Sequence, residues 1–307
     1  MSEAYHIPVL LHPSIQALIT DPDGIYVDAT FGGGGHSKAI VEQLSPKGKL
    51  FCFDQDPDAK KNFIDAFSAT NATFIPQNFR HMQKFLRVNG VSKVHGILAD
   101  LGVSSHQFDT GDRGFSIRFD GPLDMRMAQQ GTQSAYALIN ESSAEQLQYI
   151  FGHYGEVRNA RQLANAIVQT RNLFAATGGI RTTTQLRDVA LTVLKGEKNP
   201  YLAQVFQALR IAVNDEMRAL EEMLESAASL LMPQGRLVVI SYHSLEDRLV
   251  KNYMRAGNAA GEAEEDIMGR KNVPFKVITR KPVVADDEEL SINPRARSAK
   301  MRVAEKI

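Results

Sequence analysis

The sequence predicts an α/β fold in which a mainly parallel sheet is covered by helices and interrupted by an inserted helical domain. The first hundred residues alternate short apolar runs with helical patterns, as successive strand–helix–strand units do. A glycine-rich turn, residues 31–36, joins the first expected strand to the first helix of this series. The chain has 307 residues, more than the ~100–200 of a typical domain, so two structural units are expected.

Strands are expected where a short apolar run is bounded by turn residues. In the first part of the chain these are residues 24–29, 49–54, 72–76 and 94–100. The helix between the first two begins near His36 and carries Ile40, Val41 and Leu44 on one face. Later in the chain, the expected strands are residues 236–241, which are buried in pattern, and the edge strands 273–280 and 297–304.

The middle of the chain is helical in pattern. Ser142 and Glu145 have the spacing of a capping box and precede a helix with an apolar face. The expected helical insertion, residues 106–211, therefore interrupts one α/β domain made of residues 1–105 and 212–307.

Two features are expected in the second part of that α/β domain. A long helix runs from Met217 to Leu231, and Pro233 with Gly235 ends it. Residues 256–272 contain glycines and an acidic run, so we expect a mobile loop there.

The composition excludes several classes of function. Hydrophobic residues make up 43% of the chain, enough for a packed core, and 35 basic residues balance 35 acidic ones. A role in coating polyanions through summed positive charge is therefore disfavoured. Cys52 is the only cysteine, which rules out an internal disulfide and a cysteine-cluster zinc site. Neither a signal peptide nor a membrane-spanning stretch is apparent, so a cytoplasmic protein is expected.

The glycine-rich turn predicts a ligand site. Glycines let the backbone turn sharply and approach a ligand closely, and the following helix offers unpaired N–H groups. Asp54 ends the second strand ~20 residues later, where a carboxylate can accept ribose hydroxyls. Such a site suits adenosyl ligands generally, including NAD, but the third position of the dinucleotide pattern is Ser37 rather than glycine. A purely structural turn is the remaining alternative.

Six ordered motifs closely resemble one enzyme family from His6 to the C-terminus. They are residues 28–36 (Asp-Ala-Thr-Phe-Gly-Gly-Gly-Gly-His), 100–105 (Asp-Leu-Gly-Val-Ser-Ser), 113–116 (Arg-Gly-Phe-Ser), 120–127 (Asp-Gly-Pro-Leu-Asp-Met-Arg-Met), 241–248 (Ser-Tyr-His-Ser-Leu-Glu-Asp-Arg) and 293–298 (Asn-Pro-Arg-Ala-Arg-Ser). The family is that of the bacterial 16S rRNA cytosine-N4 methyltransferases, known as RsmH or MraW.

The resemblance implies a class I methyltransferase domain that uses S-adenosylmethionine, with a helical insertion that recognises the substrate. It implies methylation of the N4 amine of a 2′-O-methylated cytidine in the P-site region of 16S rRNA, within the 30S subunit. The implied cofactor residues are Gly34, Gly35, His36, Asp54, Phe79, Asp100 and Gln107. No metal is required, because a sulfonium donates its methyl group without a Lewis acid. A homodimer is compatible with the sequence but does not follow from it.

Three residues are candidates for the chemistry. The exocyclic amine of cytosine is a poor nucleophile, so the enzyme must align it with the methyl group and exclude water. Asp100 follows the fourth strand and is the leading candidate to orient the reacting groups, although it could instead bind the cofactor's amine or cap the turn. His243 and Glu246 follow the later strand, and His243 could accept the amine proton, position substrate or serve the structure.

Other residues are candidates for contact with RNA. Arginines that could bind phosphates are Arg113, Arg126, Arg248, Arg295 and Arg297, with solvated surface charge as the alternative for each. Phe115 could stack on a base or pack in the core, and Asp124 with Arg126 could contact substrate or form an ion pair. Two other functions remain alternatives: a non-catalytic cofactor-binding assembly factor of the small subunit, and an NAD-dependent oxidoreductase.

Overall fold

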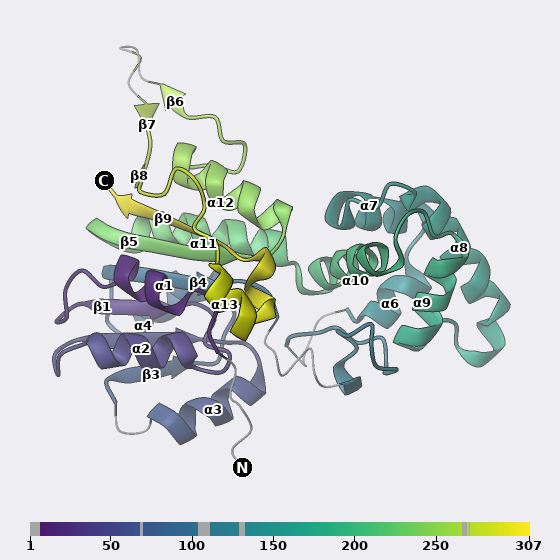
Figure 1. Cartoon of the computed structure of the whole chain (residues 1–307), viewed down its shortest axis with the longest axis horizontal. Helices are drawn as coiled ribbons and strands as arrows, with labels where there is room; N and C mark the ends of the chain where they lie inside the picture. Colours follow the sequence, from purple (N-terminus) through teal and green to yellow (C-terminus); the bar gives the residue numbers. More distant parts are fainter. Residues whose placement is uncertain (1–6, 68–69, 104–110, 129–132, 266–268, 270) are drawn as a thin grey trace. The chain divides into compact units, whose positions relative to one another are not determined.

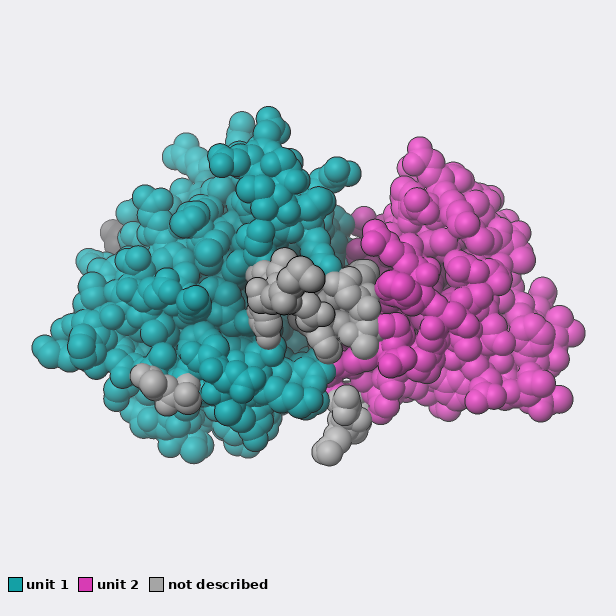
Figure 2. All heavy atoms as spheres, turned by 60° about the horizontal axis from the view of Figure 1, so that its bottom comes forward, with its two compact units in different colours: residues 1–102, 217–307 teal, residues 103–216 magenta. Residues whose placement is uncertain are grey.

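The computed structural model describes residues 7–67, 70–103, 111–128, 133–265, 269 and 271–307. The chain divides into two compact units, which Figure 2 colours separately. Unit 1 comprises residues 1–102 and 217–307, and unit 2 comprises residues 103–216. Among the described residues, no helix is both long enough and apolar enough to cross a membrane.

Unit 1 is built on a seven-stranded sheet with the order β3-β2-β1-β4-β5-β9-β8 (Figure 1). Its strands are β1 (Ile25–Asp28), β2 (Lys49–Phe53), β3 (Ala72–Ile75), β4 (Val94–Asp100), β5 (Leu231–Ser241), β8 (Phe275–Val277) and β9 (Lys300–Lys306). The first five are mutually parallel, and β9 is antiparallel to both of its neighbours. This mostly parallel sheet with a reversed strand near one edge confirms the class I fold expected from the sequence.

Helices cover both faces of the sheet. One face carries α1 (Leu11–Leu18), α2 (Gly35–Gln43) and α3 (Pro57–Phe67), and the other carries α4 (Met82–Val88), α11 (Glu216–Leu230) and α12 (Ser244–Ala256). Because strand side chains alternate between faces, Val27 and Ile97 point to the second layer, while Tyr26, Leu50 and Cys52 point to the first. The burial of Cys52 confirms its expected place in a strand.

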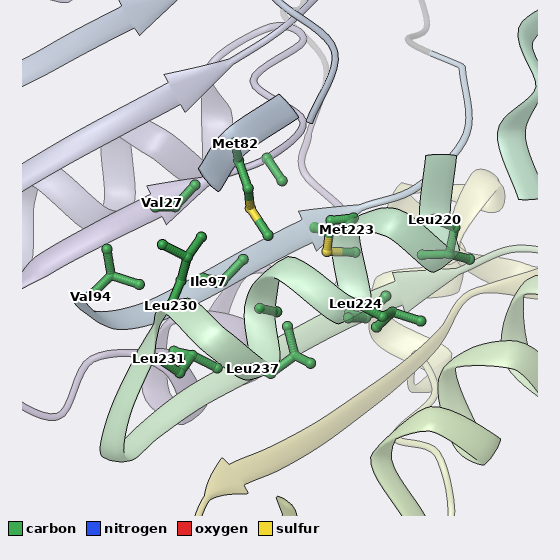
Figure 3. Close-up of a cluster of buried hydrophobic side chains, with 14 of the residues drawn as sticks. Val27, Met82, Val94, Ile97, Leu220, Met223, Leu224, Leu230, Leu231 and Leu237 are labelled. Atoms are coloured by element: carbon green, nitrogen blue, oxygen red, sulfur yellow. The ribbon is translucent and has the colours of Figure 1, made fainter. Parts of the chain in front are cut away.

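The core on the α4 and α11 face joins segments that lie far apart in the sequence. Figure 3 shows Met82 from α4 and Met223 from α11 gathered over Val27 and Ile97 of the sheet. All four side chains are fully buried. The second part of the chain therefore completes the layer that the first part begins, which makes unit 2 an insertion between two pieces of unit 1.

Unit 2 is a bundle of helices around its own core. Its helices are α6 (Ala135–Glu141), α7 (Ala144–Gly155), α8 (Ala160–Leu173), α9 (Thr183–Thr192) and α10 (Lys198–Asn214). The predicted capping box is shifted by one residue, because Ser143 caps α7 and its partner is Gln146. Ser142 instead ends α6. Because Ser142 and Ser143 are neighbours, both Ser142–Glu145 and Ser143–Gln146 fit the sequence pattern. The position at which α6 ends decides between these two pairs.

The predicted boundary between the long helix and the strand after it is wrong, and the predicted loop contains a short strand pair. The long helix ends at Leu230, and Leu231 already begins β5, where it pairs with Val94. Pro233 and Gly235 lie within β5, at an irregularity of its pairing with β4, so they interrupt a strand rather than end a helix. The region expected as a loop carries a short antiparallel pair, β6 (Glu264–Glu265) and β7 (Lys271–Asn272).

The C-terminal segment packs into the core on the α1–α3 face through Leu290, Ala296 and Ala299. Helix α13 (Asp287–Ile292) and the 3₁₀ turn η4 (Pro294–Ser298) precede β9. The expected edge strand 297–304 therefore starts three residues later than predicted, at Lys300. The other expected edge strand is present as the shorter β8.

Candidate active site

The parallel strands β1, β2, β4 and β5 end at one edge of the sheet, and polar side chains gather there. The turn after β1 needs its glycines, since Gly32 and Gly34 have φ of +53° and +79°. A Cβ on Gly34 would lie 2.8 Å from the ring of Phe31, and one on Gly35 would overlap Pro8. Gly34 caps α2, which begins at Gly35. The predicted glycine turn is thus a tight strand-to-helix connection.

Asp54 braces this glycine turn. One carboxylate oxygen accepts the Gly32 N–H at 2.8 Å, and the other accepts the Asp56 N–H at 2.8 Å. Burial raises the pKa of Asp54 to about 6, although both hydrogen bonds act in the opposite direction. The sequence suggested a ligand role for Asp54 but did not reveal that it also fixes the turn. Each oxygen keeps a further lone pair for a hydroxyl donor.

Asp100, at the end of β4, is held by three neighbours. Its N–H donates to Thr30 Oγ1 at 2.7 Å, and the Tyr242 hydroxyl donates to its Oδ1 at 2.7 Å. Its Oδ2 lies 3.8 Å from His36 Nδ1. Burial raises the pKa of Asp100 to about 7, the hydrogen bond from Tyr242 lowers it, and the charge of Glu246 raises it.

His36 is buried at the start of α2 and reaches back to the N-terminal segment. Its Nε2 lies 3.1 Å from the carbonyl oxygen of Val9. A carbonyl can only accept, so Nε2 carries the proton and Nδ1 presents a lone pair toward Asp100. Burial lowers the pKa of His36, which keeps the ring neutral.

A third carboxyl belongs to Asp28, the last residue of β1, and unlike the half-buried Asp54 and Asp100 it is fully buried. It accepts hydrogen bonds from Ser37 Oγ at 2.6 Å and from the Thr30 N–H at 3.1 Å, and burial raises its pKa. Within the described part of the chain, no lysine or arginine pairs with Asp28, Asp54 or Asp100. Desolvated carboxyls without a basic partner favour a ligand that brings positive charge.

His243 and Glu246 lie at the end of β5, where they cap α12. His243 Nδ1 is 3.4 Å from the Glu246 N–H, and Glu246 Oε2 accepts the Tyr242 N–H at 2.9 Å. Glu246 is 3% exposed. His243 Nε2 lies 3.1 Å from Glu246 Oε1 without the geometry of a hydrogen bond. Both residues are therefore part of the framework next to Asp100.

Tyr242 is the residue that the sequence reasoning missed. It lies within a quoted motif, directly after a strand whose C-terminal end was expected to face the site. This position after the strand could have pointed to Tyr242 as a site residue. The sequence does not indicate, however, that its hydroxyl reaches Asp100.

Phe79 and Gln107 are the two remaining candidates for cofactor binding. Phe79 begins the 3₁₀ turn η1 (Phe79–His81) after β3, and its half-buried ring packs against the core on the α4 face. Gln107 lies outside the described residues.

In unit 2, the charged candidates are bound to their own chain. Arg126 makes a two-pronged ion pair with Asp124, with both N–O distances 2.7 Å, and this pair lowers the pKa of Asp124. Arg113 Nη2 donates to the carbonyl oxygens of Arg126 and Met127. Phe115 is 4% exposed and packs in the core of unit 2, so its ring is not offered for the base stacking considered above.

A surface hollow of about 620 Å³ lies beside this ion pair in unit 2. Its lining includes Arg126, Ser134, Tyr136 and Arg181. Tyr136 is an exposed aromatic residue, 38% accessible, whose hydroxyl donates to the carbonyl of Gly178. The hollow thus combines cationic, aromatic and hydroxyl groups, which are the groups that contact single-stranded RNA.

The three remaining arginines are exposed on unit 1. Arg248 lies on α12, and Arg295 and Arg297 lie on η4. Nearby Arg302 is buried instead, and its Nε donates to Asp247 at 2.6 Å.

Comparisons with known proteins agree along the whole chain. A model described as the MraW methylase family matches residues 3–307. Proteins named Ribosomal RNA small subunit methyltransferase H from Flavobacterium johnsoniae and Phocaeicola vulgatus are 53% and 51% identical to it. The alignments cover 99% and 100% of this chain and 98% and 100% of those relatives. The relative of that name from Cytophaga hutchinsonii is 52% identical over 98% of this chain and 99% of its own. This chain therefore belongs to the MraW methylase family.

Proposed function

We propose that the protein uses S-adenosylmethionine to methylate the N4 amine of a 2′-O-methylated cytidine in the P-site region of 16S rRNA. The reaction would take place in the cytoplasm, on the 30S subunit. Relatives named as small-subunit rRNA methyltransferases support the RNA class. The nucleotide and the N4 position follow from the motif resemblance. Membership of a methylase family also disfavours the NAD-dependent alternative.

The observation that carries the cofactor assignment is the group of desolvated carboxyls that have no lysine or arginine partner among the described residues. S-adenosylmethionine has a sulfonium and an α-ammonium group, so it brings the positive charge that Asp100 and its neighbours lack. A Cβ at Gly34 would meet the ring of Phe31, so this tight turn depends on glycine, and Asp54 offers lone pairs to ribose hydroxyls. The residues present therefore fit this cofactor. When bound, it supplies an electrophilic methyl group.

The protein residues would bind, orient and exclude water. Asp54 would receive the ribose, and Asp100 would receive the α-ammonium group at the end of β4. Gly34, Gly35 and His36 form the turn against which the amino-acid part would lie. His243 Nδ1 accepts from the Glu246 N–H, and Glu246 Oε2 accepts from the Tyr242 N–H, so both side chains are engaged in capping α12. We therefore assign His243 and Glu246 to positioning rather than to accepting the amine proton.

Unit 2 would recognise the RNA. Its hollow offers Arg181 and Tyr136 beside the Asp124–Arg126 pair. Arg248, Arg295 and Arg297 on unit 1 are exposed and would contact phosphates. The balanced net charge gives weak general attraction to RNA, which favours a target presented in a defined shape by the assembled 30S particle.

A methyl-transfer assay tests this function directly. Labelled S-adenosylmethionine would be incubated with 30S subunits from cells that lack the endogenous enzyme, and nucleoside mass spectrometry would identify the product. We expect N4-methylated cytidine in 16S rRNA, with less product on protein-free rRNA. Asp100→Asn is the matched inactive control. Tight cofactor binding without transfer to either RNA would contradict the proposed activity and would favour the non-catalytic assembly factor.

A further inference from the structure

We propose that Tyr242 is a positioning residue for the cofactor, because its hydroxyl fixes Asp100 so that the second carboxyl oxygen is reserved for the α-ammonium group. This inference rests on the proposed function, since it assigns the ammonium of S-adenosylmethionine to Asp100. It adds a residue outside the glycine turn to the cofactor site.

Tyr242 is held at both ends. Its backbone N–H donates to Glu246 Oε2 at 2.9 Å, inside the capping box of α12. Its hydroxyl donates to Asp100 Oδ1 at 2.7 Å, and its ring packs against the core on the α1–α3 face. The Asp100 N–H is itself fixed by Thr30. Thr30 therefore fixes the backbone of Asp100, and Tyr242 fixes the orientation of its carboxyl.

The fixed orientation leaves Asp100 Oδ2 facing another acceptor. His36 Nδ1 is 3.8 Å away, and its lone pair points to Asp100 because His36 Nε2 donates to Val9. Two acceptors that face each other without a donor between them are unfavourable. An ammonium group has three N–H donors and can satisfy both atoms at once. Because the Tyr242 hydroxyl already donates to Oδ1, Oδ2 is the carboxyl oxygen that would accept from the ammonium group together with His36 Nδ1.

The hydroxyl also favours the ionised state of Asp100. The titratable groups around this carboxyl are His36 on α2, Tyr242 after β5, Glu246 on α12 and Asp28 on β1. Burial and the charge of Glu246 raise the pKa of Asp100, whereas the hydrogen bond from Tyr242 lowers it. Burial is the main cause that raises the pKa of Tyr242, and the negative charge of Asp100 raises it further. The phenol therefore keeps its proton.

Tyr242→Phe removes the hydroxyl and keeps the ring. The pKa of Asp100 then rises, less of it is ionised near pH 7, and the ammonium is bound less tightly. We expect the affinity for S-adenosylmethionine to fall about tenfold at pH 7. The loss should shrink as the pH rises toward 9, because Asp100 ionises again.

The measurement is calorimetric titration of wild type and Tyr242→Phe between pH 6 and pH 9, with two probes. One is S-adenosylmethionine, and the other is 5′-methylthioadenosine, which lacks the amino-acid part. We expect Tyr242→Phe to lower the affinity for the first probe only, and to move the pH midpoint of its binding upward. Tyr253→Phe, a similar change at a tyrosine buried in α12 away from Asp100, should alter neither.

The outcomes separate the two proposals. Wild-type protein that does not bind S-adenosylmethionine would overturn the proposed function and this inference with it. If wild type binds but Tyr242→Phe keeps the same affinity and pH profile, the positioning role is wrong while the function stands. Equal loss for both probes at every pH would also overturn it, because a merely structural role predicts that result.

Discussion

The two units treat their acidic residues in opposite ways. In unit 1, Asp28 is buried and Asp54 and Asp100 are half-buried at the ends of parallel strands, and desolvation raises the pKa of each. In unit 2, Asp124 faces Arg126 across a two-pronged ion pair, and its pKa is lowered. The carboxyls of unit 1 thus oppose the stability of the ligand-free fold when they ionise, whereas Asp124 contributes to the order of its own loop.

This difference indicates where a cationic ligand belongs. A carboxylate already paired with arginine gains little from a second cation, since its charge is compensated. A desolvated carboxyl whose nearest polar neighbours are hydroxyls, N–H groups and a neutral histidine gains much more. Unit 1 is therefore built to receive positive charge, and unit 2 keeps its acid neutralised beside a hollow lined by one further cation, Arg181.

The largest expected effect is on the pH dependence of stability. Desolvation raises the pKa of Asp54 to about 6 and that of Asp100 to about 7, from the ordinary 3.8 of an aspartate, so the folded state binds these protons more tightly. Stability should therefore fall as the pH rises from about 4 to about 8, by on the order of a few kcal/mol. Urea unfolding of the ligand-free protein at several pH values measures this fall.

Asp100→Asn is the control for this measurement. It keeps an acceptor for Tyr242 and removes one titrating group, so its stability should vary less with pH than that of the wild type. Identical pH profiles for the two proteins would break the contrast between the units.

A second prediction concerns the affinity for the cofactor. Asp54→Asn removes the charge while keeping an acceptor for the Gly32 N–H. The affinity for S-adenosylmethionine should fall by ~1.5–3 kcal/mol, roughly 10- to 150-fold, because a charged acceptor to the ribose is lost. Calorimetry measures the change. Asp56→Asn is the matched control two residues away, and a greater loss there would move the ribose contact to Asp56.

The sequence predicted the fold well because its signals are local. Alternating apolar runs located the strands of unit 1, and the glycine turn located the start of α2. The errors lie where two neighbours fit the same pattern, as with Ser142 and Ser143, or where breakers such as Pro233 interrupt a strand instead of a helix. The secondary-structure propensity of a segment does not indicate which strand the segment will pair with.

The candidate site was predicted less completely than the fold. The identities of Asp54, Asp100, His243 and Glu246 follow from their places after strands, but their partners do not. The Tyr242 hydroxyl reaches Asp100 across 142 positions of sequence, and His36 is fixed by Val9, 27 positions away. Such contacts depend on the order of strands in the sheet, which no local motif encodes. For the same reason, the burial of Phe115 could not be read from its motif.

A third prediction tests the compensated acid of unit 2. Asp124→Asn should cost ~1 kcal/mol, a modest value because both partners are about one-third exposed and solvent screens their attraction. The pKa of Asp124 is lowered in the folded state, so its contribution is present above the unfolded pKa of about 4 and lost as the pH falls through the lower folded value. This direction is opposite to that expected for unit 1.

Hydrogen exchange of the Arg126 and Met127 amides, together with urea unfolding, measures this contribution. Asp188→Asn, at an exposed pair with neighbouring Arg187, is the control and should change little. If Asp124→Asn increased stability at pH 7, the two units would not differ in the way proposed.

The smallest expected effect is at the hollow of unit 2. If the arginines of unit 2 that lack an acidic partner bind RNA phosphates, Arg181 should contribute to RNA binding. Arg181 lines this hollow and pairs with no acid among the described residues, whereas Arg187 lies 3.0 Å from Asp188. Arg181→Gln should weaken binding to 30S subunits by roughly 0.5–1 kcal/mol and reduce the slope of affinity against salt by about one phosphate contact. Filter binding at several salt concentrations measures both quantities, with Arg187→Gln as the matched control.

Because a paired arginine must first leave its carboxylate to reach a phosphate, Arg187→Gln should leave the slope of affinity against salt unchanged. Equal effects at the two arginines would mean that general positive charge, rather than a defined surface of unit 2, attracts the RNA.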